Sequence, residues 1–161
     1  MQSAARLLFA TARIIAGIAL AAMVFIITLE IIVRNLFGPS LQLADEVGGY
    51  LLVTAAFFAM ADAYSANSMM RIEFLYERTR GAARLGLDLI YDLVALAATL
   101  ILVWFSARFT LSSWTRGTYA STYLETPQWL PQLAIPAGLS VLAIAIILSA
   151  SATARQLLRR H

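Results

Sequence analysis

Carboxyl side chains inside the apolar part of the sequence are the residues whose chemistry could matter most. Glu30 lies near the end of an apolar run, where a lone carboxylate is costly and often functional. Such a group could bind and release protons during transport. Arg34 follows four residues later, and residues four apart share one face of a helix, so the two side chains can pair. We therefore favour a neutralised structural pair, with proton coupling at Glu30 as the alternative.

Further carboxyl groups flank the apolar runs in the middle of the sequence. Asp45 and Glu46 directly precede one run, where the helix dipole favours negative charge, so helix capping alone would explain them. Asp88 and Asp92 continue a four-residue step that begins at Arg84, a spacing typical of a structural charge ladder on a helix. Neither pair predicts acid–base catalysis, because the sequence shows no pocket or substrate beside them.

The other signatures of catalysis or cofactor binding are missing from the sequence. There is no cysteine, and the only histidine is the last residue, His161. No phosphate-binding glycine loop, metal-ligand spacing or nucleophile with a histidine partner occurs. We therefore expect no enzyme activity, no cofactor and no metal site.

The elements that must position these side chains are four apolar runs. Of the 161 residues, 61% are hydrophobic and 13% are charged, whereas about a quarter of the residues of soluble domains are charged. A bilayer is therefore the expected solvent, and about 20 mostly apolar residues suffice for one spanning helix. The pattern predicts an all-α integral membrane protein, a single four-helix membrane domain over 1–161. Its spans are expected at approximately 12–36, 45–64, 86–110 and 130–153.

Two features of the apolar runs leave room for another assignment: the short length of two runs and a possible cleavage site in the first. The second and third runs, 47–61 and 93–107, reach spanning length only when charged residues at their ends are included. The first run, 14–33, contains an Ala-Leu-Ala stretch that could mimic a signal-peptide cleavage site. Because the apolar stretch continues well past that point, a retained helix is the favoured interpretation.

Arginine is distributed unequally between the two sides that four spans would define. Both termini and the connection 62–92 carry nine of the twelve arginines, and the opposite side carries Arg34, Arg108 and Arg116. The positive-inside rule therefore places both termini in the cytoplasm. An odd number of spans would remove this asymmetry. The net charge of +3 accordingly indicates orientation in a membrane and not binding to nucleic acid.

The cytoplasmic connection contains a charged stretch, 68–84, with amphipathic periodicity. Ile72, Leu75, Tyr76 and Thr79 recur at steps of three and four residues. The six charged residues of the stretch lie at other positions: Arg71, Glu73, Glu77, Arg78, Arg80 and Arg84. This pattern predicts an amphipathic helix in the plane of the membrane interface. A solvated linker that carries only the orientation signal is an equally good interpretation.

Small residues and prolines suggest how the helices pack. Ala134 and Gly138 are four apart, a spacing that lets helices approach closely in lipid. Trp129 suits an aromatic belt at the outer interface. Pro131 fits a first helical turn, and Pro136 either kinks the fourth span or marks a late start. Similar small-residue spacings occur at Gly17 and Ala21, and at Ala55, Ala59 and Ala63.

Three short patterns occur in the order that is found in a known family. Arg34 is followed by LADEVGGYLLV at 43–53, then by MMRIEFLYER at 69–78 and by TPQWLPQLAIPAG at 126–138. On these patterns the sequence resembles, over roughly its whole length, the small membrane subunit of tripartite ATP-independent periplasmic (TRAP) transporters, the DctQ-like family. It departs from the family pattern at Leu43, near a usual tryptophan, and at Met69, in place of a usual histidine.

The resemblance implies a non-catalytic role in sodium-coupled uptake of organic acids across the bacterial inner membrane. In such systems a large multi-span subunit carries the substrate and sodium sites, and a periplasmic binding protein delivers the substrate. The small subunit would extend the scaffold in the bilayer and help to dock the binding protein. The residues that the resemblance and the patterns assign to partner or membrane-interface contacts are Arg34, Asp45, Glu46, Arg71, Glu73, Leu75, Trp129 and Pro131.

Two other functions fit a small apolar chain of this kind. A self-assembling proton-coupled efflux carrier would use Glu30, although the sequence shows no internal repeat of the type on which many carriers depend. An anchor subunit of a respiratory enzyme would need histidines within the membrane, which the sequence lacks. The TRAP small subunit is therefore the preferred interpretation.

Overall fold

The computed structural model describes residues 2–38, 43–65, 82–122 and 124–158, most of which are helical. The helices are α1 (Gln2–Phe37), α2 (Leu43–Ser65), α4 (Ala82–Arg116), α5 (Trp129–Gln132) and α6 (Ala134–Leu158). By length and composition, four segments can cross a membrane: Leu7–Leu36, Ala44–Tyr64, Arg84–Arg116 and Trp129–Leu158. The predicted all-α class with four apolar helices is thus confirmed. The amphipathic helix expected at 68–84 falls almost entirely outside the described residues.

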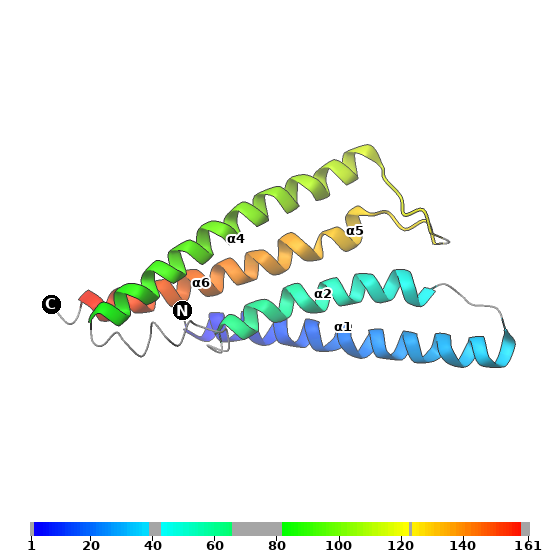
Figure 1. Cartoon of the computed structure of the whole chain (residues 1–161), viewed down its shortest axis with the longest axis horizontal. Coiled ribbons are helices and arrows are strands. Elements are labelled where there is room, and N and C mark those ends of the chain that lie inside the picture. Colours follow the sequence, from blue (N-terminus) through cyan, green and yellow to red (C-terminus); the bar gives the residue numbers. More distant parts are fainter. Residues whose placement is uncertain (1, 39–42, 66–81, 123, 159–161) are drawn as a thin grey trace.

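The four long helices lie side by side in the order α1, α2, α6, α4 (Figure 1). α1 packs mainly on α2, α4 packs mainly on α6, and α2 and α6 pack on each other. α2 and α6 therefore form the centre of the row, and α1 and α4 flank it. α1 begins and α6 ends at one end of the row, which we call the termini end (Figure 1). At the opposite end, the loop end, α1 and α4 finish and α2 and α5 begin.

The two flanking helices are longer than a bilayer requires. α1 has 36 residues and α4 has 35, so each is about 50 Å long at 1.5 Å per residue, against about 30 Å of hydrocarbon. Such helices tilt or project beyond the hydrocarbon. α4 continues to Arg116, past the expected end near residue 110, and the Thr110 hydroxyl donates to the Ser106 carbonyl oxygen at 2.9 Å within it. Because hydroxyls of this kind bond to their own helix, the polar residues after the apolar run do not end the helix.

The interior of the row is built largely from small side chains. Ala12, Ala16 and Ala19 of α1 and Ala55 and Ala61 of α2 are all buried. The remaining core is a cluster around Leu139, Leu142 and Ile146 of α6. Where lipid surrounds the helices, close packing replaces the hydrophobic drive, and small residues permit it. Large apolar side chains consequently point outward.

The expected small-residue contacts are found in part. A Cβ atom placed on Gly138 would lie 2.7 Å from the Phe57 Cβ atom, so α6 and α2 touch closely there. Gly17 and Ala59 are exposed instead, and nothing lies within 4 Å of the place of a Gly17 Cβ. Spacing alone identified Gly138 correctly, but it did not show which face of α1 or α2 is covered.

The fourth span begins with two helical pieces. α5 and α6 are separated only by Leu133, whose N–H still donates to the Trp129 carbonyl oxygen at 3.1 Å. Pro131 lies within the short first piece, as expected. Pro136 is the third residue of α6 and has no N–H to offer to the carbonyl of Gln132. The Thr110 hydroxyl of α4 lies 3.4 Å from that carbonyl oxygen, a long contact, because this hydroxyl donates its hydrogen to the Ser106 carbonyl oxygen at 2.9 Å.

Candidate functional site

A buried carboxyl group links the central and flanking helices near the termini end. Asp92 of α4 is 2% exposed, and its Oδ1 accepts a hydrogen bond of 2.5 Å from the Tyr64 hydroxyl of α2. A buried carboxyl group is costly unless it is hydrogen-bonded. The sequence pattern suggested only a ladder along α4 for Asp92, so this contact between helices was missed.

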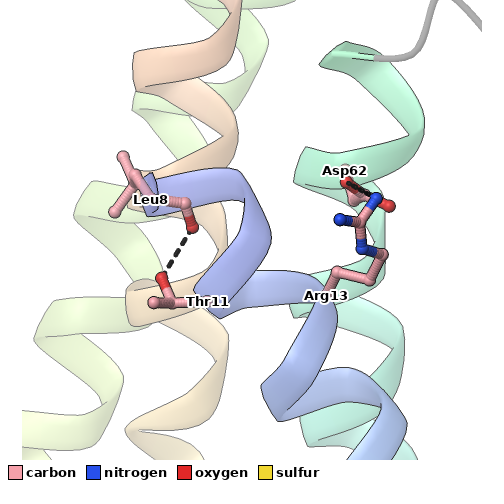
Figure 2. Close-up of polar contacts among 4 residues, drawn as sticks. All are labelled: Leu8, Thr11, Arg13 and Asp62. Carbon is pink, nitrogen blue, oxygen red and sulfur yellow. Dashed lines mark hydrogen bonds and ion pairs between the residues drawn. The ribbon is translucent and has the colours of Figure 1, made fainter. Parts of the chain in front are cut away.

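A second polar contact near the termini end joins α1 to α2. The Arg13 guanidinium lies 3.9 Å from Oδ1 of Asp62 (Figure 2). Two residues earlier, the Thr11 hydroxyl donates to the Leu8 carbonyl oxygen at 2.8 Å, within α1 (Figure 2). The Arg13 side chain is 69% exposed, and exposed ion pairs contribute little, about 0–1 kcal/mol. This pair therefore adds little to the stability of the α1–α2 contact.

At the loop end, Glu46 joins α2 to the segment between α4 and α5. Glu46 lies in the first turn of α2 and is 7% exposed. Its Oε1 accepts a hydrogen bond of 3.0 Å from the Tyr50 hydroxyl. The hydroxyls of Thr122 and Thr126 and the backbone N–H of Leu124 also lie within reach of the carboxylate. The Oε2 atom is buried and makes no hydrogen bond of good geometry to the described residues.

The segment that reaches Glu46 is a compact loop, 117–128. Ala120 N–H donates to the Thr126 carbonyl oxygen at 2.9 Å, and Gln128 N–H donates to the Thr118 carbonyl oxygen at 3.0 Å. The loop begins at Gly117 with a φ of 59° and contains Glu125 with a φ of 45°. A positive φ is natural for glycine but uncommon for a glutamate. The contacts to Glu46 therefore help to hold a loop with one unfavourable backbone position.

Two predicted interface residues lie where this loop returns to the helices. Trp129 of α5 packs edge to face on Trp114 of α4, with ring centroids 4.3 Å apart. Pro131 lines a pocket of about 300 Å³ between α2 and α5, together with Tyr50 and Gln132. Both residues therefore belong to the loop end of the structure, and Trp129 holds the start of the fourth span against α4.

The remaining predicted residues at the loop end meet around one pocket. Glu30 and Arg34 of α1 and Asp45 of α2 line a cavity of about 380 Å³ between the two helices. Sequence spacing predicted that Glu30 and Arg34 share a helix face, and the common pocket agrees with this. Asp45 joins them because α2 runs antiparallel to α1 (Figure 1). Asp45 is exposed and lines this pocket, whereas the neighbouring Glu46 is buried and contacts the 117–128 loop.

The other predicted contact residues, Arg71, Glu73 and Leu75, lie outside the described residues. Among the residues that the structure does describe, no group of three histidine, aspartate or glutamate side chains is placed to hold a metal ion. The polar contacts that sequence reasoning missed are those between different helices or between a helix and the 117–128 loop. Their only signal in the sequence was charge at the ends of apolar runs.

Large apolar side chains cover the outward faces of the two flanking helices. On α1, Ile18, Val24 and Phe25 are each at least 64% exposed. On α4, Trp104 and Phe105 are exposed to a similar degree. Such surfaces are suited to contact with lipid or with another membrane protein.

Comparison with known proteins identifies the chain. A family model described as "Tripartite ATP-independent periplasmic transporters, DctQ component" matches residues 23–156. This match reaches all four apolar helices and includes the Glu46 contact, the 117–128 loop and the Glu30 pocket. A search of curated proteins found no match. The chain belongs to the DctQ component family of tripartite ATP-independent periplasmic transporters.

Proposed function

We propose that this chain is a non-catalytic scaffold subunit that binds the large membrane subunit of a TRAP transporter. The observation that carries the proposal is the DctQ family match over residues 23–156. On this proposal the system takes up an organic acid by sodium coupling, and the substrate and sodium sites lie in the large subunit. The chain resides in the bacterial inner membrane with both termini in the cytoplasm.

The exposed apolar flanks of the helix row support a scaffold role. A row with α2 and α6 at its centre leaves one long face of α1 and one of α4 uncovered by the residues that the structure describes. A scaffold must present such a face to a partner while the other faces meet lipid. The aromatic residues Trp104 and Phe105 of α4 provide large, stiff side chains of the kind that dominate contact energies.

The loop end supplies a surface for the periplasmic binding protein. Tyr119 is 61% exposed and Leu124 is 41% exposed on the 117–128 loop. Apolar residues on a structured loop outside the spans are suited to contact with a soluble partner. Glu46 supports this role because it ties the loop to α2.

The charged stretch 68–84 is proposed as an interfacial anchor in which Leu75 faces the membrane. Replacing Leu75 by Glu would place a charge on the apolar face. We expect less complex to assemble in the Leu75→Glu variant, whereas Glu77→Gln on the charged face should assemble normally. Equal assembly of both variants would contradict the anchor and would favour the interpretation of this stretch as a solvated linker.

Affinity purification from native membranes tests the scaffold proposal. A tagged chain should retain a much larger multi-span protein in one-to-one proportion, and a tagged unrelated four-span protein should not. Purification of the chain only with copies of itself would favour the self-assembling carrier instead.

A further inference from the structure

The outward face of α4 follows one regular spacing along most of the helix. Its exposed residues are separated alternately by four and three residues, the spacing of a helix face that packs lengthwise on another helix. The opposite face carries the buried residues Asp92, Thr99 and Thr110 and is turned toward the rest of the row. We call the exposed set the lateral seam, and it consists of Ile90, Val94, Ala97, Ile101, Trp104, Arg108, Leu111 and Thr115.

Arg108 is the charged member of the lateral seam. Its neighbours along the seam, Trp104 and Leu111, are each 63% exposed. Arg108 is exposed as well, and its guanidinium makes no ion pair with a carboxyl group of the described residues. The lateral seam therefore combines large apolar side chains with one cation that lacks an anion.

Contacts with the fourth span give the depth of Arg108. The preceding residue, Ala107, lines a pocket of about 290 Å³ together with Pro136 of α6. Trp114 packs on Trp129, where the fourth span begins. Arg108 comes six residues before Trp114, which is about 9 Å further from the loop end at 1.5 Å per residue. A guanidinium inside the spans is costly unless an anion pairs with it.

The outward face of α1 has no such charge. It also exposes large apolar side chains, among them Val24 and Phe25. Residues 14–29 contain no charged residue, so lipid tails alone can cover this part of α1. Lipid tails offer no partner for a guanidinium. Of the two flanking helices, α4 is therefore the one whose outward face fits a protein partner.

We propose that the lateral seam of α4 binds a membrane-spanning helix of the large subunit, and that a carboxylate on this helix pairs with Arg108. A guanidinium and a carboxylate form two parallel hydrogen bonds, which sets the register of the two helices. Trp104 and Leu111, about one turn to either side, pack on the partner helix and keep water from the ion pair. This inference rests on the proposed function, because the large subunit is the partner.

Two other occupants fit the lateral seam less well. Two copies of this chain share one orientation in the membrane, so a symmetric contact along α4 would bring both Arg108 side chains to one depth. Like charges at close range in a low dielectric repel each other. A lipid phosphate would pair with Arg108 but would not account for a seam that continues from residue 90 to residue 115.

Binding of the co-purified large subunit by single variants tests the lateral seam. Arg108→Leu removes the charge, and Arg116→Leu makes the same change at the exposed last residue of α4. Trp104→Ala removes an aromatic side chain from the seam, and Phe25→Ala removes one that is 68% exposed on α1. We expect Arg108→Leu and Trp104→Ala to weaken binding in detergent micelles at least about tenfold, because each removes a side chain at the centre of the contact. The two control variants should bind like the natural chain.

Photocross-linking in native membranes locates the partner independently of affinity. A photoreactive phenylalanine analogue at position 101 of α4 should cross-link to the large subunit, and the same analogue at position 25 of α1 should not. The opposite pattern would overturn the inference and place the partner on α1.

The failure of this inference differs from the failure of the proposed function. A natural chain that retains no large subunit would overturn both. Retention by the natural chain, together with unchanged binding in Arg108→Leu, would overturn this inference alone, and Arg108 would then contact lipid phosphate. Thermal unfolding of each variant without the large subunit should match that of the natural chain, because the altered side chains are exposed.

Discussion

Gly138 of α6 lies against the backbone of Phe57 of α2 so closely that no side chain fits between them. A Cβ atom at residue 138 would lie 2.7 Å from the Phe57 Cβ atom and 2.8 Å from its carbonyl carbon. Since backbone atoms cannot move aside as a flexible side chain can, this contact fixes the spacing of the two central helices. The rest of the row is assembled on that pair.

Replacing Gly138 by Ala should therefore separate α2 from α6 and destabilise the chain by about 1–3 kcal/mol, the usual cost of overpacking. Gly17→Ala is the matched control, because a Cβ atom there meets nothing within 4 Å. Thermal unfolding in detergent measures both variants. A Gly138→Ala protein as stable as the Gly17→Ala protein would show that the helix pair tolerates a wider spacing.

Replacing Tyr64 by Phe should lower the stability of the termini end. The variant leaves the Asp92 carboxyl group, which is 2% exposed, without its hydrogen bond from α2. The expected loss is about 1–3 kcal/mol, the cost of leaving a buried polar group unsatisfied. Tyr91→Phe, one residue before Asp92, removes a hydroxyl that makes no hydrogen bond to the described residues and serves as the control. Chemical denaturation in mixed micelles compares the two, and equal midpoints would contradict the assigned role of Tyr64.

Replacing Glu46 by Ala should loosen the 117–128 loop. The variant removes the carboxylate that Tyr50, Thr122 and Thr126 approach, and loss of hydrogen bonds to a charged group costs about 1.5–3 kcal/mol. If cleavage follows local opening, chymotrypsin should cut the loop about tenfold faster or more. Asp45→Ala also removes a charge from the first turn of α2, so it controls for the helix dipole. Similar cleavage rates in the two variants would mean that the loop keeps its structure without the contacts to Glu46.

Single cysteines can establish how the row is oriented, because the natural chain contains no cysteine. Ser121→Cys lies in the exposed 117–128 loop, and Gln156→Cys lies in the last turns of α6 at the termini end. A membrane-impermeant maleimide added to intact spheroplasts should label residue 121 alone and should reach residue 156 only after permeabilisation. The reverse pattern would contradict the assignment from the arginine distribution.

Sequence reasoning located the helices well because lipid makes long apolar runs unambiguous. It also identified Gly138 as a contact site between helices, because small residues in spanning helices permit close packing. It did not give the order α1, α2, α6, α4, because periodicity shows which residues share a face but not which helix covers that face. This is why Gly17 and Ala59 were assigned to packing although both are exposed.

The polar contacts were harder to predict than the helices for a related reason. Capping explained Glu46 adequately, and nothing local indicated that Thr122 and Thr126 would fold back onto it from the far end of α4. Asp92 was placed in a ladder along its own helix, whereas its observed partner is Tyr64 on α2. Contacts between distant segments depend on the tertiary arrangement, which a single sequence does not reveal.

Uptake by reconstituted liposomes tests the central claim most directly. Liposomes would contain this chain alone, its co-purified large subunit alone, or both, and each set would receive the periplasmic binding protein, labelled substrate and a sodium gradient. The scaffold assignment predicts accumulation only when both membrane proteins are present, and none in liposomes that hold this chain alone. Transport by this chain alone, driven by a proton gradient, would contradict it and would make Glu30 the centre of a self-sufficient carrier.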